Sequence, residues 1–185
     1  MPVQRVYPQH PVAFNLFFRM TQRTIIRNGT IVNEGRLVAA DLLIENGRIQ
    51  QIGVVPEDAA ATVIDATGKY LLPGVIDGQV HFREPGLTHK GDLYSESKAA
   101  VAGGVTSFID MPNTLPNVLT MELLQEKYRL AERQSLANFG FLLGVNGDNL
   151  DEVIGLDKSG LLGVTDDGLY FTKKGNLLAL SLIHI

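Results

Sequence analysis

A run of polar side chains with strand-like spacing carries the clearest chemistry in the sequence. It extends from Asp77 to Gly86 and reads D-G-Q-V-H-F-R-E-P-G. Alternate residues of a strand share a face, which groups four polar side chains: Asp77, Gln79, His81 and Arg83. Burying them without partners would be costly, so the pattern predicts a wet cavity, a metal or a bound anion. The alternative is an edge strand whose polar face meets solvent, but Pro85-Gly86 ends the strand just past His81 and Arg83, which favours a site.

Two further polar motifs follow later apolar runs. Asp110-Met111-Pro112-Asn113-Thr114 comes directly after the second run, and its Asn113 offers both a donor and an acceptor, although Pro-Asn alone is commonly a turn. Thr165-Asp166-Asp167-Gly168 ends the fourth run, where paired carboxylates before a glycine suit either a turn or cap or metal ligation. Since successive parallel strands end at the same edge, we expect these groups to converge on one pocket: His81, Arg83, Asn113, Asp166 and Asp167.

The segments that must position these groups alternate between strand and helix. Apolar runs that predict strands occupy 75–82, 105–111, 139–144 and 161–165, and helical spacing covers 92–102, 120–134 and 149–156. This order implies parallel strands joined by right-handed crossovers. We therefore predict an α/β fold: the N-terminal part of a (β/α)8 TIM-type barrel, with about four strands, whose chemistry lies at the C-terminal strand ends.

The segment before these alternating strands and helices has a different pattern, which predicts β-strands alone. Residues 22–72 consist of short β-branched runs punctuated by Asn28-Gly29, Asn46-Gly47 and Thr67-Gly68, which we interpret as hairpin turns of a small β-sheet subdomain. The predicted organisation is a disordered or non-native leader at 1–21, this subdomain at 22–72, the barrel part at 73–179 and an unrelated tail at 180–185.

Composition narrows the function classes. The 185 residues include 16 Lys and Arg, 20 Asp and Glu, and no cysteine, for a formal charge of −4. Without a basic run, neither nucleic acid nor an anionic membrane surface is an expected partner, and no apolar run approaches the ~18 residues of a membrane span. Any metal must be held by histidines and carboxylates, because thiolates are absent.

Residues 22–179 resemble the first half of a dihydroorotase, a member of the amidohydrolase superfamily. The motifs that carry the resemblance are V-H-F-R-E-P-G, M-P-N-T and T-D-D-G. It implies that His81 is the second histidine of a metal-binding pair and a substrate contact, and that Arg83 and Asn113 hold the substrate carboxylate. It also implies that Asp167 bridges two zinc ions. Arg83 favours a dihydroorotase over an allantoinase, because a guanidinium fork binds a carboxylate bidentately.

The sequence departs from the family pattern at Gln79, which stands in the place of the first metal histidine. An amide oxygen is a far weaker zinc ligand than an imidazole, so the more deeply held zinc is expected to bind loosely or not at all. The family's later metal histidines and its proton-transferring aspartate belong to strands beyond the fourth, so no catalytic residue is assigned.

The resemblance implies a zinc-dependent, cytoplasmic cyclic amidohydrolase that interconverts dihydroorotate and N-carbamoyl-aspartate in pyrimidine biosynthesis. The expected partners are the small-molecule substrate and either a second copy of the chain or aspartate transcarbamoylase. We expect this chain alone to be inactive. Two alternatives stay open: a non-catalytic pseudo-dihydroorotase scaffold, which Gln79 favours, and a related allantoinase or hydantoinase.

Overall fold

A computed structural model describes residues 22–157 and 160–166. The chain divides into two compact units, one ending at Pro73 and the other beginning at Gly74, and each is described by itself. The predicted leader, the predicted tail and Asp167 lie outside the described residues. Within the described ranges, no helix has the length and apolar character needed to cross a membrane.

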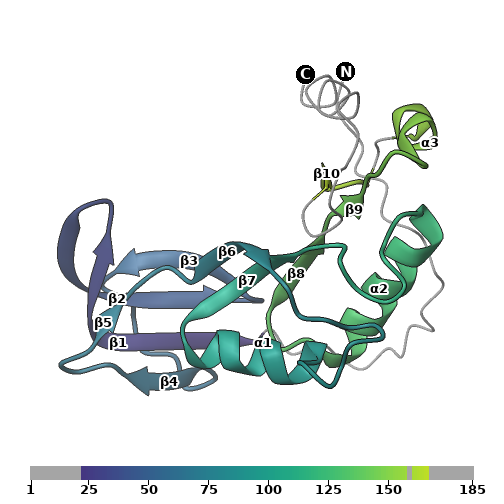
Figure 1. The fold of residues 1–185 in the computed structure, drawn as a ribbon. Helices are drawn as coiled ribbons and strands as arrows, with labels where there is room; N and C mark the ends of the chain where they lie inside the picture. Colours follow the sequence, from purple (N-terminus) through teal and green to yellow (C-terminus); the bar gives the residue numbers. More distant parts are fainter. Residues whose placement is uncertain (1–21, 158–159, 167–185) are drawn as a thin grey trace, which may run out of the picture. The chain divides into compact units, whose positions relative to one another are not determined.

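The first unit is a five-stranded β-sheet (Figure 1). Its strands are β1 (Arg23–Asn33), β2 (Arg36–Glu45), β3 (Arg48–Gly53), β4 (Thr62–Asp65) and β5 (Tyr70–Leu71). The order is β3-β2-β1-β4, and β5 also pairs with β1. The β1–β2 and β2–β3 pairs are antiparallel, whereas β4 and β5 run parallel to β1.

Only one of the three predicted hairpin turns is a hairpin. Asn46-Gly47 joins β2 to β3 with φ angles of 51° and 75°. Asn28-Gly29 instead lies inside β1, where the register with β2 shifts, and Thr67-Gly68 connects two strands that both run parallel to β1. The β1–β2 turn is Glu34-Gly35. An Asn-Gly pair marks positive φ, which a β-bulge uses as readily as a turn, so the dipeptide alone did not fix the topology.

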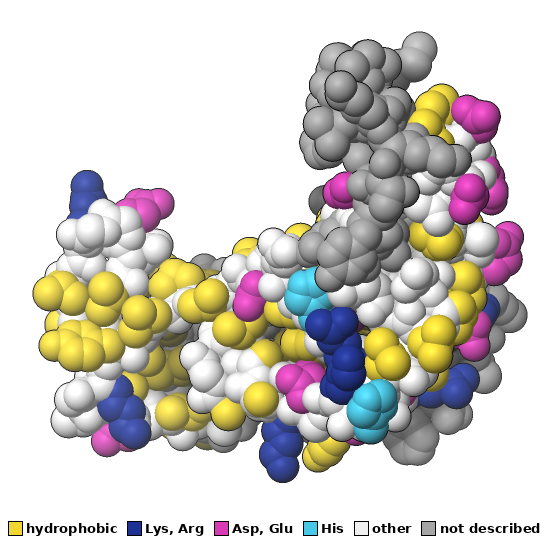
Figure 2. All heavy atoms as spheres, viewed as in Figure 1, with side chains coloured by type: hydrophobic (Ala, Val, Ile, Leu, Met, Phe, Trp, Pro, Cys, Tyr) yellow, Lys and Arg dark blue, Asp and Glu magenta, His cyan; other side chains and the backbone are white. Residues whose placement is uncertain are grey.

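The first unit has a small core and an apolar surface. Ile25, Leu43 and Val55 form its buried cluster. Large apolar side chains remain on its surface, as the yellow areas of Figure 2 show, and they include Leu37, Ile49, Ile52, Val54 and Val63.

The second unit alternates strand and helix as predicted. A parallel sheet of order β6-β7-β8 contains β6 (Val75–Val80), β7 (Val105–Asp110) and β8 (Asn138–Phe141). The crossovers contain α1 (Leu93–Ala102) and α2 (Met121–Gln134). Beyond them, β9 (Leu143–Gly144) and β10 (Val164–Thr165) form a second parallel pair, with α3 (Leu150–Gly155) between them in sequence. The predicted strand at 139–144 is therefore two short strands.

The helices start where the sequence offers capping side chains. Asp92 accepts a hydrogen bond from the Ser95 backbone N–H at the start of α1, and the Thr120 hydroxyl accepts one from Leu123 at the start of α2. The core lies between these helices and the sheet, and its buried members include Leu93, Phe108, Leu124, Ala131 and Phe141.

The end of β6 differs from the prediction. The strand stops at Val80, and its register with β7 shifts between Asp77 and Val80, so one polar face does not continue through Arg83. Past the strand, the Phe82 N–H donates to the Asp110 carboxylate instead of a strand carbonyl, and Arg83 has a φ of 64°. The Phe82 ring enters the core, with its centroid 4.4 Å from that of Phe108. His81 and Arg83 consequently flank a core residue on the loop that leaves β6.

Candidate functional site

His81 and Asn113 lie in contact where β6 and β7 end. The His81 Nδ1 is 2.9 Å from the Asn113 Oδ1, although the residues are 32 positions apart in sequence. An amide oxygen only accepts, so Nδ1 carries the proton and donates. Nε2 is the ring's other nitrogen, an atom type that commonly ligates metals or meets substrates.

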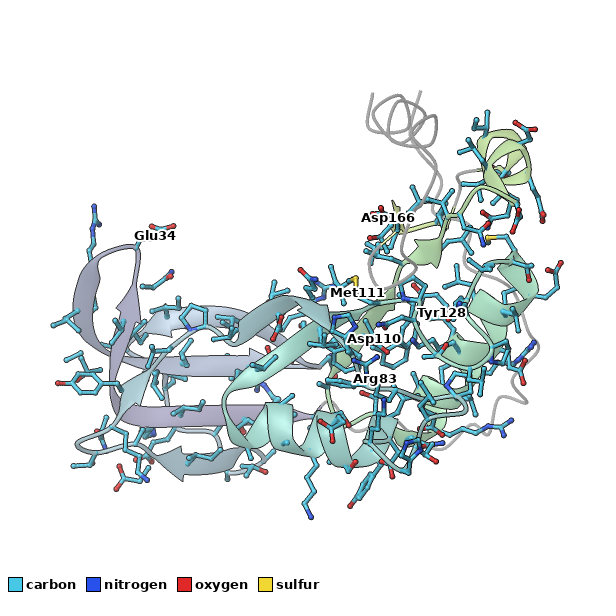
Figure 3. The ribbon with its side chains drawn as sticks, in the orientation of Figure 1. Glu34, Arg83, Asp110, Met111, Tyr128 and Asp166 are labelled. Carbon is cyan, nitrogen blue, oxygen red and sulfur yellow. The ribbon has the colours of Figure 1, made fainter. Side chains whose placement is uncertain are left out.

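Arg83 lies two residues beyond His81 and is partly buried. Its backbone carbonyl accepts a hydrogen bond from the Leu87 N–H at 3.0 Å. Among the described residues, no ion pair or hydrogen bond engages its guanidinium, and the Asn113 Nδ2 likewise has no acceptor there. Figure 3 labels Arg83 near Asp110 and Met111. The two loops that follow β6 and β7 therefore each offer a nitrogen donor, one on Arg83 and one on Asn113.

The loops that carry these donors are fixed to each other. The Leu115 N–H donates to the Pro85 carbonyl at 3.1 Å, which joins the loop after β6 to the loop after β7. Gly86 permits this approach: its φ is 83°, and a Cβ there would overlap the Leu115 carbonyl oxygen. Within the second loop, the Val118 N–H donates to the Pro112 carbonyl at 3.0 Å. Asn113 thus belongs to a compact loop held against the one that carries Arg83.

Glu84, the residue after Arg83, is anchored to both helices. Its Oε2 accepts from the Leu93 N–H at 2.8 Å, at the start of α1. Its Oε1 accepts from the Gln134 Nε2 at 3.3 Å, at the end of α2. With Phe82 in the core and Glu84 tied to the helices, the backbone on both sides of Arg83 is held in place.

A buried ion pair lies directly behind the site. The Lys127 Nζ is 2.7 Å from the Asp110 Oδ2, and both side chains are only 1% exposed. Burial lowers the pKa of Lys127, and the carboxylate of Asp110 opposes that shift. The Lys127 Nζ also lies 4.9 Å from the centroid of the Phe141 ring.

The sequence motifs predict no role for this pair. Asp110 belongs to the D-M-P-N-T motif, but the predicted site residue of that motif is Asn113. A usable signal was present in the predicted helix at 120–134. Lys127 falls three residues after Leu124 and four before Ala131, on the stripe that is buried in α2. A lysine on an apolar stripe indicates a buried partner.

The carboxylates expected to bind metal are only partly described. Asp166 is partly buried directly after β10, whereas Asp167, the predicted zinc ligand, lies outside the described residues. Gln79 is exposed, and its backbone N–H donates to the Asp77 side chain at 3.1 Å. In the described part of the chain, no three His, Asp or Glu side chains gather as a metal site. Zinc takes three or four protein ligands, so these residues alone do not fit a zinc ion.

Comparison with protein families and curated sequences identifies relatives. Residues 68–179 match the family described as Dihydro-orotase-like. A dihydroorotase of Methanosarcina acetivorans is 42% identical over 147 residues, covering 79% of this chain and 31% of that protein. A dihydroorotase of Lactococcus lactis is 37% identical over 158 residues, covering 83% of this chain and 37% of that protein. The chain thus spans about a third of the length of these relatives.

Solved structures with the same fold include hydantoinases. An L-hydantoinase (dihydropyrimidinase) from Arthrobacter aurescens aligns with a TM-score of 0.76 and 28% identity, over 87% of this chain and 38% of that one. A D-hydantoinase aligns with a TM-score of 0.70 and 31% identity, over 88% and 38% of the two chains. These likenesses confirm the predicted fold class, a partial (β/α)8 barrel preceded by a small β-sheet subdomain. By sequence and fold, the chain belongs to the dihydro-orotase-like family.

Proposed function

We propose that this chain supplies the substrate-carboxylate site of a cyclic amidohydrolase that interconverts dihydroorotate and N-carbamoyl-aspartate. The observation that carries the proposal is a pair of nitrogen donors on the loops that follow β6 and β7. The Arg83 guanidinium and the Asn113 Nδ2 are both without an acceptor among the described residues. Because a guanidinium is always charged, it calls for an anionic partner, and a carboxylate matches its planar fork.

The orientation of Asn113 supports this assignment. Its Oδ1 is engaged by the His81 Nδ1 at 2.9 Å, so the side of the amide left for a ligand is the Nδ2 donor. A donor beside a guanidinium suits an anion and would not suit a cation. Hydrogen bonds to charged groups contribute about 1.5–3 kcal/mol each, so the pair is able to select a carboxylate-bearing ring over a neutral one.

The two substrates of the proposed reaction meet this requirement. Dihydroorotate carries a carboxylate on its ring, and N-carbamoyl-aspartate retains that carboxylate after the ring opens. Arg83 and Asn113 would therefore hold both by the same group. His81, next to Asn113, would contact the ligand from the Nε2 side of its ring.

The chain offers two candidate zinc ligands in this proposal. His81 is a candidate ligand through Nε2, and Asp167 is a candidate through its carboxylate. Two ligands are fewer than zinc requires. We therefore expect no turnover by this chain alone, and no step of the reaction is assigned to a metal here.

The wider setting is inferred from family membership. Dihydroorotase relatives support a place in pyrimidine biosynthesis and, with it, a cytoplasmic location. Association with a second copy or with aspartate transcarbamoylase belongs to the same inference. Two other functions each have one observation in their favour. The hydantoinase structures favour a hydantoinase, and Gln79, in the place of a metal histidine, favours a non-catalytic scaffold.

A ligand panel separates these functions. The chain is titrated with dihydroorotate, N-carbamoyl-aspartate, dihydrouracil and hydantoin in a calorimeter, and its zinc content is measured in parallel. The proposal predicts that both carboxylate ligands bind at least about tenfold more tightly than the two neutral rings. Preference for hydantoin would indicate a hydantoinase. Binding of none of the four, with no zinc retained, would favour the scaffold and contradict the proposal.

A further inference from the structure

The buried pair of Asp110 and Lys127 contacts the backbone of both site loops. Asp110 is the last residue of β7, and its Oδ1 accepts from the Phe82 N–H at 3.0 Å and from the Met111 N–H at 2.9 Å. The Lys127 Nζ donates to the Met111 carbonyl at 3.1 Å. Phe82 lies between His81 and Arg83, and Met111 lies two residues before Asn113. Each contact is therefore one or two residues from a side chain of the proposed carboxylate site (Figure 3).

Packing alone does not account for this pair. Moving a carboxylate and an ammonium out of water carries a large desolvation cost, and well-packed apolar side chains fill such a volume at no such cost. The pair also lies against the apolar core: the Lys127 Nζ is 4.9 Å from the centroid of the Phe141 ring, which belongs to the same buried cluster as Phe82 and Phe108. An apolar pair would lack the three hydrogen bonds that Asp110 and Lys127 make to the backbone of Phe82 and Met111.

One of those three bonds extends the pairing of β6 and β7 by one residue, past the last backbone bond between them, in which the Met111 N–H donates to the Val80 carbonyl at 3.0 Å. Phe82 is past the last residue of β6, so its N–H has no strand carbonyl opposite it, and the Asp110 carboxylate is its acceptor. The same carboxylate oxygen holds the next residue of the neighbouring strand, Met111. The buried carboxylate thus joins the loop of Arg83 to the loop of Asn113, between two backbone bonds that also link them, Met111 N–H to the Val80 carbonyl and Leu115 N–H to the Pro85 carbonyl.

We propose that Asp110 and Lys127 are positioning residues, which hold the backbone at Phe82 and Met111 so that His81, Arg83 and Asn113 keep the arrangement that binds a carboxylate. The proposal rests on the proposed function for the identity of the ligand. Its geometric part, the His81–Asn113 contact, is observable without any ligand.

The test uses variants of this pair that differ in which bonds they keep. Lys127→Met keeps the length of the side chain and removes the link to the Met111 carbonyl. Because it leaves the Asp110 charge buried without its partner, Asp110→Leu/Lys127→Met is made as well, which leaves no buried charge and removes all three bonds to the loop backbone. Asp110→Asn/Lys127→Gln is the rescue variant, since two amides are able to pair with each other and still reach the Phe82 N–H and the Met111 backbone. Leu124→Ala, one turn earlier on α2, is the matched control for loss of stability.

Two readouts are taken on every variant that folds. Nitrogen NMR of the His81 ring reports whether the proton stays on Nδ1, and calorimetry reports the ratio of dihydroorotate to dihydrouracil affinity. The proposal predicts that both Lys127→Met variants give a mixture of His81 tautomers and lower that affinity ratio by about tenfold or more. It predicts that the Asn/Gln pair restores the wild-type tautomer and ratio, and that Leu124→Ala leaves both unchanged while lowering the melting temperature.

Either of two results would overturn the proposal. One is a folded Asp110→Leu/Lys127→Met protein with the wild-type tautomer. The other is a Leu124→Ala protein that loses the tautomer to the same extent. If the wild-type chain binds neither ligand, the proposed function fails, and the tautomer alone then decides whether the pair positions the loops.

Discussion

At the residue scale, the site depends on how a few donors and acceptors are shared. The Asn113 Oδ1 accepts from the His81 Nδ1 at 2.9 Å, and this one bond sets two orientations. It assigns the proton of the imidazole to Nδ1, and it turns the amide donor of Asn113 away from His81. The charge of Arg83 and the donor of Asn113 then have the complementarity that a carboxylate requires.

Removing the Asn113 amide tests this sharing. In Asn113→Ala, the His81 Nδ1–H loses its acceptor, so we expect the ring to populate both neutral tautomers. Nitrogen NMR of the imidazole distinguishes them. Asn117→Ala, in the same loop and exposed, is the control and should leave the His81 signals in place. A single Nδ1–H tautomer retained in Asn113→Ala would show that this bond does not set the state of the ring.

At the element scale, the site depends on how two loops are held where β6 and β7 end. Glu84 joins the first loop to α1 and α2, and the Leu115 N–H joins the second loop to the Pro85 carbonyl. Gly86 lies at the closest approach between the loops, and Asp92 begins the helix that follows. Each makes a prediction.

Gly86→Ala should destabilise the second unit. An alanine at a φ of 83° costs about 1–2 kcal/mol on its own, and its Cβ would also overlap the Leu115 carbonyl oxygen. Urea unfolding measures the loss. Gly103→Ala is the matched control, because its φ is −87° and its nearest contact would be an ordinary 3.5 Å. Equal stability of the two variants would contradict the close approach of the loops.

Asp92 should make the stability of α1 depend on pH. Hydrogen bonds from the Ser95 backbone N–H and then from its side chain lower the pKa of Asp92 below its ordinary value of 3.8. Because the folded state favours the ionised form, this contribution is present above the ordinary value and is lost as the pH falls through the lower folded value. Asp92→Asn keeps an acceptor but not the charge.

The measurement is the urea midpoint at about pH 6 and about pH 3, below the unfolded pKa. We expect the midpoint of the wild type to fall more between these conditions than that of Asp92→Asn. Asp92→Ala should be less stable than Asp92→Asn at both, because it also loses the cap. Identical pH dependence in wild type and Asp92→Asn would contradict the role of the charge.

Comparison of the predicted and observed helices and strands shows which features the sequence predicts. The helices at 93–102 and 121–134 were predictable because Asp92 and Thr120 are local capping signals. The end of β6 was not, because it depends on a hydrogen bond from Phe82 to Asp110, 28 residues away. The pairing of β4 and β5 with β1 was missed for a similar reason, since a turn dipeptide does not say which strand will be the neighbour. The position of Lys127 on the apolar stripe of its helix indicates a buried partner, but the sequence does not identify that partner as Asp110.

At the scale of the whole molecule, the described strands leave edges without partners. Among them, β6 is hydrogen-bonded only to β7, and it forms one end of the parallel sheet. Its residues Val75 and Ile76 are 55% and 70% exposed. An exposed apolar edge strand is a template for pairing with another chain. The described part of the chain therefore presents a surface prone to association.

We expect the chain to associate as its concentration rises, and sedimentation velocity measures this directly. Ile76→Lys should reduce association, because a charge on an edge strand opposes pairing. Val101→Lys is the control, since Val101 is also exposed but lies on α1. A chain that stays monomeric at all concentrations, or that responds equally to both substitutions, would contradict a role for the β6 edge.

The central claim is that Arg83 binds the carboxylate of a cyclic amide. The most direct measurement is a thermodynamic cycle that combines one substitution with one change of ligand. Wild type and Arg83→Gln are each titrated with dihydroorotate and with dihydrouracil, which is the same ring without the carboxylate. The account predicts that Arg83→Gln weakens dihydroorotate binding by about tenfold to a hundredfold and leaves dihydrouracil binding nearly unchanged. Equal losses for both ligands, or no loss for either, would show that Arg83 does not recognise the carboxylate.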